Sequence, residues 1–352
     1  MIDIVIVVGF LVLGLTALFA WAFRHLPGEK WQIIATFPRQ REPDGTWRGV
    51  NLTYYGLFNA LGIAAAVMVS VFLAGAAGLP LTHMAVALVA ILAVCLPASK
   101  IINRLVEGHW HGFTVGGASF AGIIIGPWLA AGIAHLGQKA GGSQEAVNML
   151  AIMAIAYALG EGIGRLACIS FGCCYGRPLT DFPNWLQKWF SHWTFVFEGR
   201  MKKSSYASGF EGQRLIPVQG MTAIISSAAG PVGIALFLGG FPLPGCVITI
   251  MATQVWRFVS EFLRADYRGT GRISAYQWMA LAGGTYSLAF CLLWPDAPRL
   301  TTSVAQGLAL LWTPGAMLLI ASLAVFVFIR MGVSTVTTAH ITFNLQDEMI
   351  IK

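Results

Sequence analysis

Long apolar segments alternate with polar ones along most of the chain. Nine segments are continuously apolar, and each has about 15 to 25 residues, the length of a membrane-crossing helix. They are residues 2–23, 54–77, 84–100, 114–136, 146–168, 217–239, 245–263, 275–294 and 308–329. Continuous apolarity favours helices over a membrane barrel, because each helix satisfies its own backbone hydrogen bonds. We therefore predict an all-α integral membrane protein, a polytopic bundle of about nine transmembrane helices.

Two connections are longer than the others. Residues 169–216 are numerous enough to form a small extramembrane cap, and aromatic residues such as Trp185 and Trp189 favour a position at the lipid interface. Residues 24–53 are polar, and we expect them to lie at the membrane surface. Near the C-terminus, STVTTAHITF alternates like a short strand.

Composition excludes several classes of protein. Of the 352 residues, 57% are hydrophobic and only 11% are charged, whereas soluble domains carry about 25% charged residues. A cytosolic enzyme, a secreted module and an ordinary nucleic-acid binder are therefore excluded. Asp3 stands where a signal peptide would carry basic residues, so we expect the first span to be retained.

The net charge of +7 comes from basic residues in the connecting loops and indicates how the chain is oriented in the membrane. Nine alternating spans place most of the 22 lysines and arginines on one face, whereas the opposite face carries Lys139 and Arg299. Because cytoplasmic loops are enriched in basic residues, the basic face is predicted to be cytoplasmic, with the N-terminus outside.

Polar residues of several spans converge at this basic face. Arg165 and Glu161 end the fifth span, and Arg257 and Glu261 end the seventh. An ionisable residue inside a bilayer costs roughly 2.5 to 3.5 kcal/mol on insertion scales, so this convergence indicates a functional site. The alternatives are snorkelling at helix ends and simple pairing of Arg257 with Glu261.

Paired arginines indicate an anionic ligand. Guanidinium offers planar, forked donors and a permanent charge that suit phosphate, and a membrane presents phosphate on its lipid headgroups. The apolar bundle would hold the acyl chains. We therefore predict a phospholipid substrate.

The run GEGIGRLACISFGCCYGRP, residues 160–178, carries a family resemblance. It resembles the signature of bacterial prolipoprotein diacylglyceryl transferases, Gly-Arg-x-Gly-Asn-Phe-x-Asn-Gly-Glu-x-x-Gly-Arg. Further elements that look like the family's are Tyr55-Gly56, the glycine motif at 116–122, Pro-x-Gln at 217–219 and Arg-(x)3-Glu-Phe-x-Arg at 257–264. The resemblance implies a seven-helix transferase-like core over residues 54–294, with the cap at 169–216 and an extra helix in each of the segments 1–53 and 295–352.

Several family positions differ in this chain. The family's histidine in the glycine motif falls on Ala121, its two asparagines fall on Cys168 and Phe171, and its signature glutamate falls on Cys173. The histidine before Pro-x-Gln falls on Ile216. The resemblance thus implies a retained lipid-donor site with altered acceptor chemistry.

The family reaction moves the diacylglyceryl group of phosphatidylglycerol to a cysteine thiol and releases glycerol phosphate. By resemblance, Arg165 and Arg257 would hold the lipid phosphate, Tyr55 would orient the headgroup, Glu261 would fix Arg257, and Arg264 would lie at the mouth. The remaining expected substrate-binding residues are Gly116, Gly117, Gly164, Gly176, Arg177, Gln219, Cys168 and Cys173. No cofactor is expected, and the acceptor is either a lipoprotein cysteine or another group.

The proton acceptor has more than one candidate. His109 and His111 titrate in the useful range, although histidines at a helix end are also common structural residues. Cys168, Cys173 and Cys174 could supply a nucleophile. With a histidine they could bind zinc, but C-(x)4-C-C lacks the usual paired spacing, so packing beside the lipid is the default and no metal is expected.

Orientation separates this chain from the family. The family's site faces the periplasm, with the basic loops on the other side of the bacterial inner membrane, whereas here the basic loops lie on the side of the site. We expect an inverted topology with a cytoplasmic acceptor; the alternative is a basic cap that binds anionic headgroups. A non-catalytic phospholipid-binding protein stays open as well, whereas a transporter would need polar residues reached from both faces.

Overall fold

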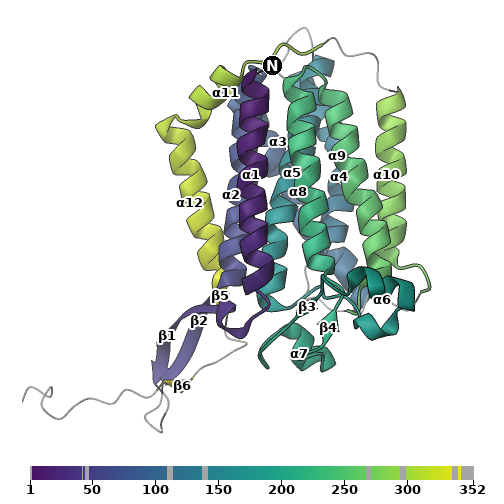
Figure 1. Ribbon diagram of the computed structural model, residues 1–352. Coiled ribbons are helices and arrows are strands. Elements are labelled where there is room, and N and C mark those ends of the chain that lie inside the picture. Colours follow the sequence, from purple (N-terminus) through teal and green to yellow (C-terminus); the bar gives the residue numbers. More distant parts are fainter. Residues whose placement is uncertain are drawn as a thin grey trace, which may run out of the picture.

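The computed structural model describes residues 2–41, 43, 47–108, 114–136, 142–266, 271–293, 299–334 and 340–341. Long helices run side by side, with a small sheet and a cluster of short elements at one end of the bundle (Figure 1). The helices of the bundle are α1 Ile2–His25, α2 Tyr54–Ala76, α3 Leu81–Glu107, α4 Val115–Leu136, α5 Gly142–Phe171, α8 Val218–Leu238, α9 Pro242–Ser260, α10 Ala275–Leu293, α11 Val304–Leu311 and α12 Pro314–Gly332.

Within the described ranges, eight helices are long and apolar enough to cross a membrane. This confirms the predicted all-α membrane bundle. The predicted eighth span is α10, a 19-residue helix packed against α9 and α4 that falls outside those eight. Polar residues such as Gln277 and Ser287 dilute its apolar sequence.

Two predicted spans, the third and the ninth, differ most clearly from the helices of the structure. The third is longer than predicted, because α3 begins at Leu81 and continues through its polar end until Gly108, whose φ of +79° ends the helix. The ninth is split into α11 and α12, because Pro314 begins a new helix whose N-terminus is capped by the Thr313 side chain.

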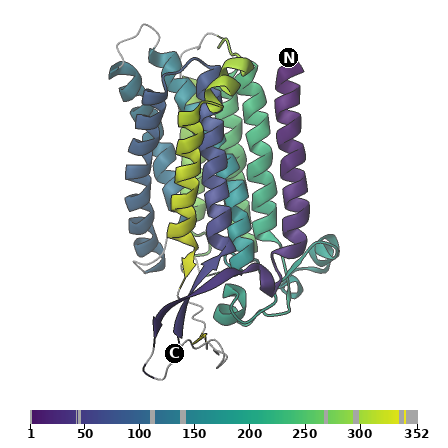
Figure 2. The same cartoon turned by 90° about the vertical axis from the view of Figure 1, so that its left-hand side faces the viewer.

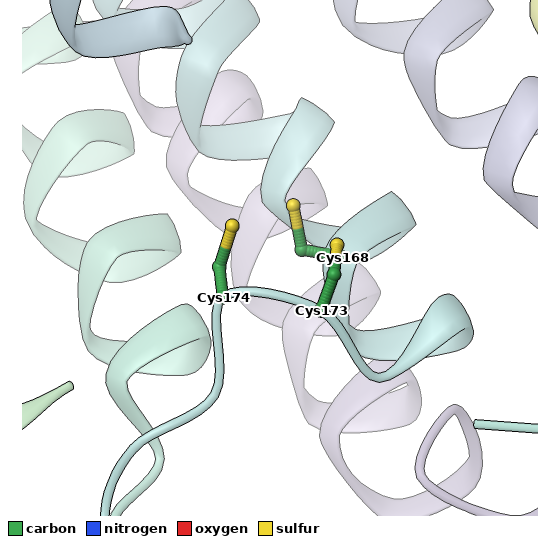
Figure 3. Close-up of side chains that lie close together, drawn as sticks. All are labelled: Cys168, Cys173 and Cys174. Atoms are coloured by element: carbon green, nitrogen blue, oxygen red, sulfur yellow. The ribbon is translucent and has the colours of Figure 1, made fainter. Parts of the chain in front are cut away.

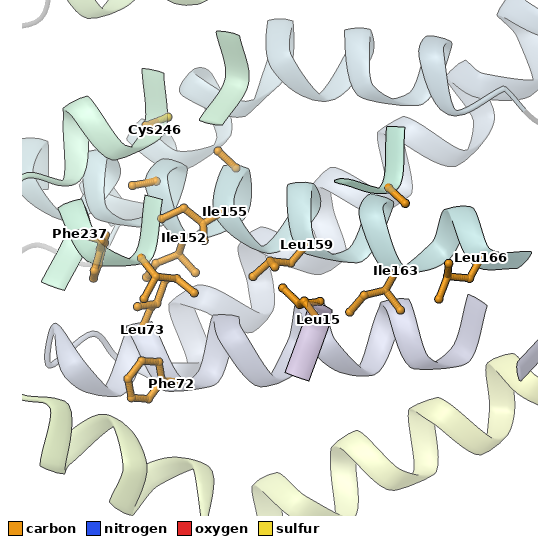
Figure 4. Close-up of a cluster of buried hydrophobic side chains, with 14 of the residues drawn as sticks. Leu15, Phe72, Leu73, Ile152, Ile155, Leu159, Ile163, Leu166, Phe237 and Cys246 are labelled. Atoms are coloured by element: carbon orange, nitrogen blue, oxygen red, sulfur yellow. The ribbon is translucent and has the colours of Figure 1, made fainter. Parts of the chain in front are cut away.

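Helix α5 lies at the centre of the bundle. In an apolar stretch of 18 residues within each helix, 67% of the residues are buried in α5 and in α8, against 17% in α3 and α12 and 11% in α1. Along α5, Ile152, Ile155 and Leu159 lie between α2 and α8, which contribute Leu73 and Phe237 to the same cluster (Figure 4). The outer helices expose apolar side chains, as expected of surfaces that contact lipid.

Glycines let the central helices approach closely. A Cβ added at Gly62 of α2 would lie 2.7 Å from the Gly160 oxygen of α5, and one at Gly56 would lie 2.1 Å from Gly332 Cα of α12. Small residues are what permit such close helix contacts in membranes.

The connection expected to lie at the surface contributes two of the four strands of a small sheet. Strand β1 Ile33–Arg41 pairs antiparallel with β2 Trp47–Thr53, and β5 Val333–Ser334 and β6 His340–Ile341 also pair with β2. The short tail strands agree with the alternation predicted there; residues 335–339 lie outside the described part. Strand β2 continues directly into α2, so the sheet extends from the end of the bundle (Figures 1 and 2).

The cap consists of short elements between α5 and α8. They are the 3-10 turn η2 Leu179–Asp181, α6 Asn184–Phe190, β3 Phe195–Val196, α7 Lys203–Ser208 and β4 Arg214–Leu215. Strand β3 pairs with β4, and Trp185 and Trp189 of α6 are 66% and 81% exposed. The turns η1 Glu29–Trp31 and η3 Glu261–Leu263 lie at the same end.

A buried lysine joins the cap to two helix ends. The Lys202 Nζ donates hydrogen bonds to the carbonyl oxygens of Leu26 and Ser170, at 2.9 and 2.6 Å, beside the C-terminal ends of α1 and α5. Burial lowers the pKa of Lys202 to about 7, against the opposite effect of Glu29 and Glu198.

Candidate functional site

A cavity of about 530 Å³ lies at the cap end of the bundle. Its wall includes side chains from α2, α3, α4, α5, α8, α9 and α10, together with residues of the cap and of β5. Among the residues predicted to form the site, those that line it are Tyr55, Gly116, Arg165, Cys168, Cys173, Arg257, Glu261 and Arg264.

Two arginines meet at one carboxylate inside this cavity. The Nη2 atoms of Arg165 and Arg257 lie 2.5 and 2.8 Å from Oε1 of Glu161. Arg257 Nη2 also donates to the Tyr157 hydroxyl at 2.6 Å. Because residues four apart lie on one face of a helix, Tyr157, Glu161 and Arg165 form a row along α5, and α9 brings Arg257 to it.

This ion cluster is almost completely buried, but some of its hydrogen-bond donors have no partner within the described residues. The side chains of Arg165 and Arg257 are 10% exposed, and that of Glu161 is 4% exposed. Within the described part of the chain, the Nε atoms of both arginines are buried and have no hydrogen-bond partner. Each guanidinium has five donors, so the pair retains capacity for a further anion.

Arg264 is held by a different carboxylate. Its Nε and Nη2 donate to the two carboxylate oxygens of Asp266 at 2.8 and 2.7 Å, a bidentate pair. Burial opposes the charge of Arg264, but Asp266 raises its pKa well above the ordinary value. Glu261 lies 3.8 Å from Arg264 and accepts a hydrogen bond from the Ser274 hydroxyl. Arg257 donates its carboxylate hydrogen bond to Glu161. The sequence predicts Glu261 for this contact.

Helix α4 passes close to Arg257 at Gly116. A Cβ on Gly116 would lie 3.2 Å from Arg257 Nη1 and 3.0 Å from the Tyr276 ring. Gly117, in contrast, packs against Ile102 of α3. A Cβ on Gly164 would meet nothing within 4 Å.

Other predicted residues shape the cap loop rather than the cavity wall. Arg177 Nη2 donates to the Phe262 carbonyl at 2.9 Å, and its guanidinium lies 4.5 Å from the centre of the Phe182 ring. A Cβ on Gly176 would lie 2.3 Å from a backbone oxygen of the cap, and Gln219 Nε2 donates to the Cys173 carbonyl at 2.8 Å. Tyr55 lines the cavity and packs edge-on against the Phe171 ring.

The three cysteines of the signature region lie together. Cys168 is in the last turn of α5, and Cys173 and Cys174 follow the helix (Figure 3). Their Sγ atoms all lie within 4.8 Å of one another. Hydrogen bonding by Cys168, then by Cys173, lowers the pKa of Cys174 well below its ordinary value, although burial opposes this. The charges of Arg264 and Arg165 act in the same direction as the hydrogen bonds.

Two candidates for the general base lie outside the described residues, namely His109 and His111. The sequence counted Glu161 only among the converging polar residues and assigned no role to Glu107. Glu161 is the central carboxylate, and Glu107 of α3 accepts a hydrogen bond from the Tyr276 hydroxyl at 2.9 Å in the cavity wall. The spacing of four residues between Tyr157, Glu161 and Arg165 was a usable signal in the sequence. No sequence pattern indicated the contact between α3 and α10.

Residues 46–293 match the family model described as prolipoprotein diacylglyceryl transferase. The chain belongs to this family. The matched segment spans α2 to α10 and contains the cap and most of the cavity wall, so the site lies within the part shared with the family. No curated protein shows significant sequence similarity to the chain.

Family membership makes the protein a multi-pass membrane transferase with a lipid substrate. Three of the positions at which the chain departs from the diacylglyceryl transferase signature lie close to the arginines. Cys168, Phe171 and Cys173 all line the same cavity as the two arginines. These three altered residues and the two retained arginines thus belong to the wall of one cavity.

Proposed function

We propose that the protein transfers a diacylglyceryl group from an anionic phospholipid, such as phosphatidylglycerol, to a nucleophilic acceptor. The observation that carries this proposal is the buried pair of guanidinium groups, Arg165 and Arg257, at one end of an apolar bundle. Both have an unpartnered Nε within the described structure, and both line a cavity of the size that small-molecule sites have.

In the proposed reaction, the lone pair of the acceptor attacks the glyceryl carbon that carries the phosphate. The carbon–oxygen bond breaks, the phosphate oxygen takes the electron pair, and the proton of the acceptor passes to water. Arg165 and Arg257 stabilise the charge that develops on this leaving group, in a site where buried donors act strongly. Tyr55 orients the headgroup, and Arg264, held by Asp266, lies at the mouth.

The acceptor is proposed to differ from that of a standard lipoprotein reaction. The family's histidine falls on Ala121, and its signature glutamate falls on Cys173. These changes support a change in how the acceptor is bound or deprotonated, while the arginines support an unchanged donor. A lipoprotein cysteine remains one acceptor to test.

The test uses purified protein and phosphatidylglycerol carrying a labelled headgroup. We expect release of labelled glycerol phosphate, detected by mass spectrometry, and its loss in Arg165→Ala and Arg257→Ala variants that still elute as folded protein. Arg39→Ala, on the exposed strand β1, is the matched control and should retain activity. Bound but unconsumed phosphatidylglycerol would instead support a non-catalytic lipid-binding protein.

The cap face is proposed to be cytoplasmic in the bacterial inner membrane. The support is the distribution of basic residues, most of which lie in connections at the same end as the cap and the sheet. On this proposal the acceptor reaches the cavity from the cytoplasm.

A further inference from the structure

Three thiols share one part of the cavity wall and all are free. Cys168, Cys173 and Cys174 are neither disulfide-bonded nor dispersed, and their Sγ atoms lie within 4.8 Å of one another (Figure 3). Thiols that merely pack behave as small hydrophobic groups and need no such convergence. A cluster of this kind matches the ligand set of a thiophilic metal ion.

The backbone holds the third thiol in an unfavourable conformation. Cys174 has a φ of +55° and is the one non-glycine residue with positive φ in the described chain. Such a conformation costs free energy and persists where the surroundings fix it. The Cys173 amide donates to the Cys168 carbonyl at 3.0 Å, and Gln219 donates to the Cys173 carbonyl. These bonds fix the loop before any ligand arrives.

We propose that Cys168, Cys173 and Cys174 bind one zinc ion as thiolates and leave its fourth position for the acceptor thiol. A zinc–sulfur distance of about 2.3 Å in a tetrahedron requires sulfur atoms about 3.8 Å apart. Because no two of the Sγ atoms are more than 4.8 Å apart, each pair needs to approach by no more than about 1 Å to reach this distance. Three protein ligands with one open position is the usual arrangement of reactive zinc sites.

The charges around the cluster suit this assignment. Three thiolates and Zn²⁺ carry a net negative charge, and the cations Arg165 and Arg264 line the same cavity. Arg165 precedes Cys168 by three residues on α5, so the two side chains lie on the same helix face. Thiolates also select zinc or Cu(I) over the hard cations Mg²⁺ and Ca²⁺.

The consequence for catalysis rests on the proposed function. An acceptor thiol that binds zinc loses its proton to water and becomes a thiolate. Its lone pair forms the sulfur–carbon bond as the carbon–oxygen bond to phosphate breaks. The thioether product is a weaker ligand and leaves the zinc, and the glycerol phosphate leaves from the arginines. Zinc would thus supply the acceptor thiolate in a chain that has Ala121 at the position of a family histidine.

The first test measures the metal directly. Full-length protein purified in detergent is incubated with zinc chloride and desalted, and its zinc content is determined by mass spectrometry of the metal. We expect about one zinc ion per chain in the wild-type protein and in the Cys246→Ser control, whose thiol is buried in α9 away from the cluster. Serine at any of the three clustered cysteines should abolish retention.

A second measurement needs no substitution. Zinc should slow iodoacetamide alkylation of the three clustered cysteines severalfold and leave the alkylation rates of Cys95 and Cys291 unchanged. Folded wild-type protein that retains no zinc, alkylation that zinc does not slow, or a disulfide among the three cysteines in protein purified without reductant would each overturn the zinc site.

Turnover of phosphatidylglycerol separates this inference from the proposed function. One bound zinc per chain with no lipid consumed under any condition would leave the metal site standing and reject the transferase proposal. Equal lipid consumption before and after the zinc is removed by a chelator would reject acceptor activation by zinc and leave the transferase proposal standing. Consumption that is lost with the metal and restored by zinc supports both.

Discussion

Replacing Glu161 with glutamine tests the charge balance on which the proposed site depends. The change keeps the size and a hydrogen-bond acceptor but removes the negative charge between Arg165 and Arg257. At 2.8 Å and an effective dielectric constant near 20, each ion pair is worth about 6 kcal/mol before desolvation. Loss of one partner from a buried cluster costs about 3–5 kcal/mol overall, because buried charge is left uncompensated.

We therefore expect Glu161→Gln to lower the melting temperature of the lipid-free protein substantially. An anionic headgroup would supply the missing negative charge, so phosphatidylglycerol should stabilise the variant more than it stabilises the wild type. Ligand stabilisation grows with the ratio of ligand concentration to its dissociation constant, so the comparison is made at matched lipid concentrations. The assay is thermal unfolding in detergent, with and without phosphatidylglycerol, and with zwitterionic phosphatidylcholine in parallel.

Asp181→Asn is the matched control, because it removes a carboxylate from the exposed turn η2 and should change stability by no more than about 0.5 kcal/mol. If Glu161→Gln is as stable as the wild type, or if both lipids stabilise it equally, the arginines do not form an anion site and the reasoning fails.

Three further predictions concern packing, pH and topology. Gly62→Ala should destabilise the bundle by roughly 1–3 kcal/mol in denaturant unfolding because its Cβ would meet a backbone oxygen of α5, whereas Gly164→Ala, with open space, should be neutral or stabilising. Because the folded pKa of Lys202 is about 7, below its unfolded value of 10.5, this group should make the protein more stable as pH rises from 7 towards 10; a Lys202→Met variant with the same pH dependence of melting temperature would contradict this. Asn184→Cys in the cap should be labelled by a thiol reagent from the cytoplasmic side and Thr82→Cys, at the opposite end, from the outside; the reverse result would reject the proposed inversion.

The membrane-spanning helices were accessible from the sequence because each one depends on its own apolar length. The main exception lies at Pro314, which begins α12 and divides the predicted ninth span, whereas Pro97 lies within α3 as it did within the predicted third span. The sheet was not predicted as a unit, because β2 pairs with strands from both ends of the chain. Such pairing is a long-range property that alternation alone does not specify.

The arginines of the site were predicted to converge, and the structure brings them to one carboxylate. Their convergence followed from topology, since spans five and seven both end at the basic face. The hydrogen-bond partner of Arg257 depends on how α5 and α9 are rotated against each other. Arg257 bonds to Glu161 of α5, whereas the sequence suggested Glu261, four residues further along its own segment. The thiol cluster depended on the left-handed turn at Cys174, which no spacing rule anticipates.

The retained and altered halves of the site have different physical demands. Holding a phosphate requires permanent positive charge in a buried place, and guanidinium is the side chain that supplies it, so Arg165 and Arg257 have no ready substitute. Deprotonating an acceptor only requires a means of favouring its anion, and a basic side chain or a coordinated metal ion can each do so. A chain can therefore exchange its acceptor chemistry and keep its donor site. The cavity has this composition, with two arginines on Glu161 beside three thiols, of which Cys168 and Cys173 fall at positions where the family carries polar residues.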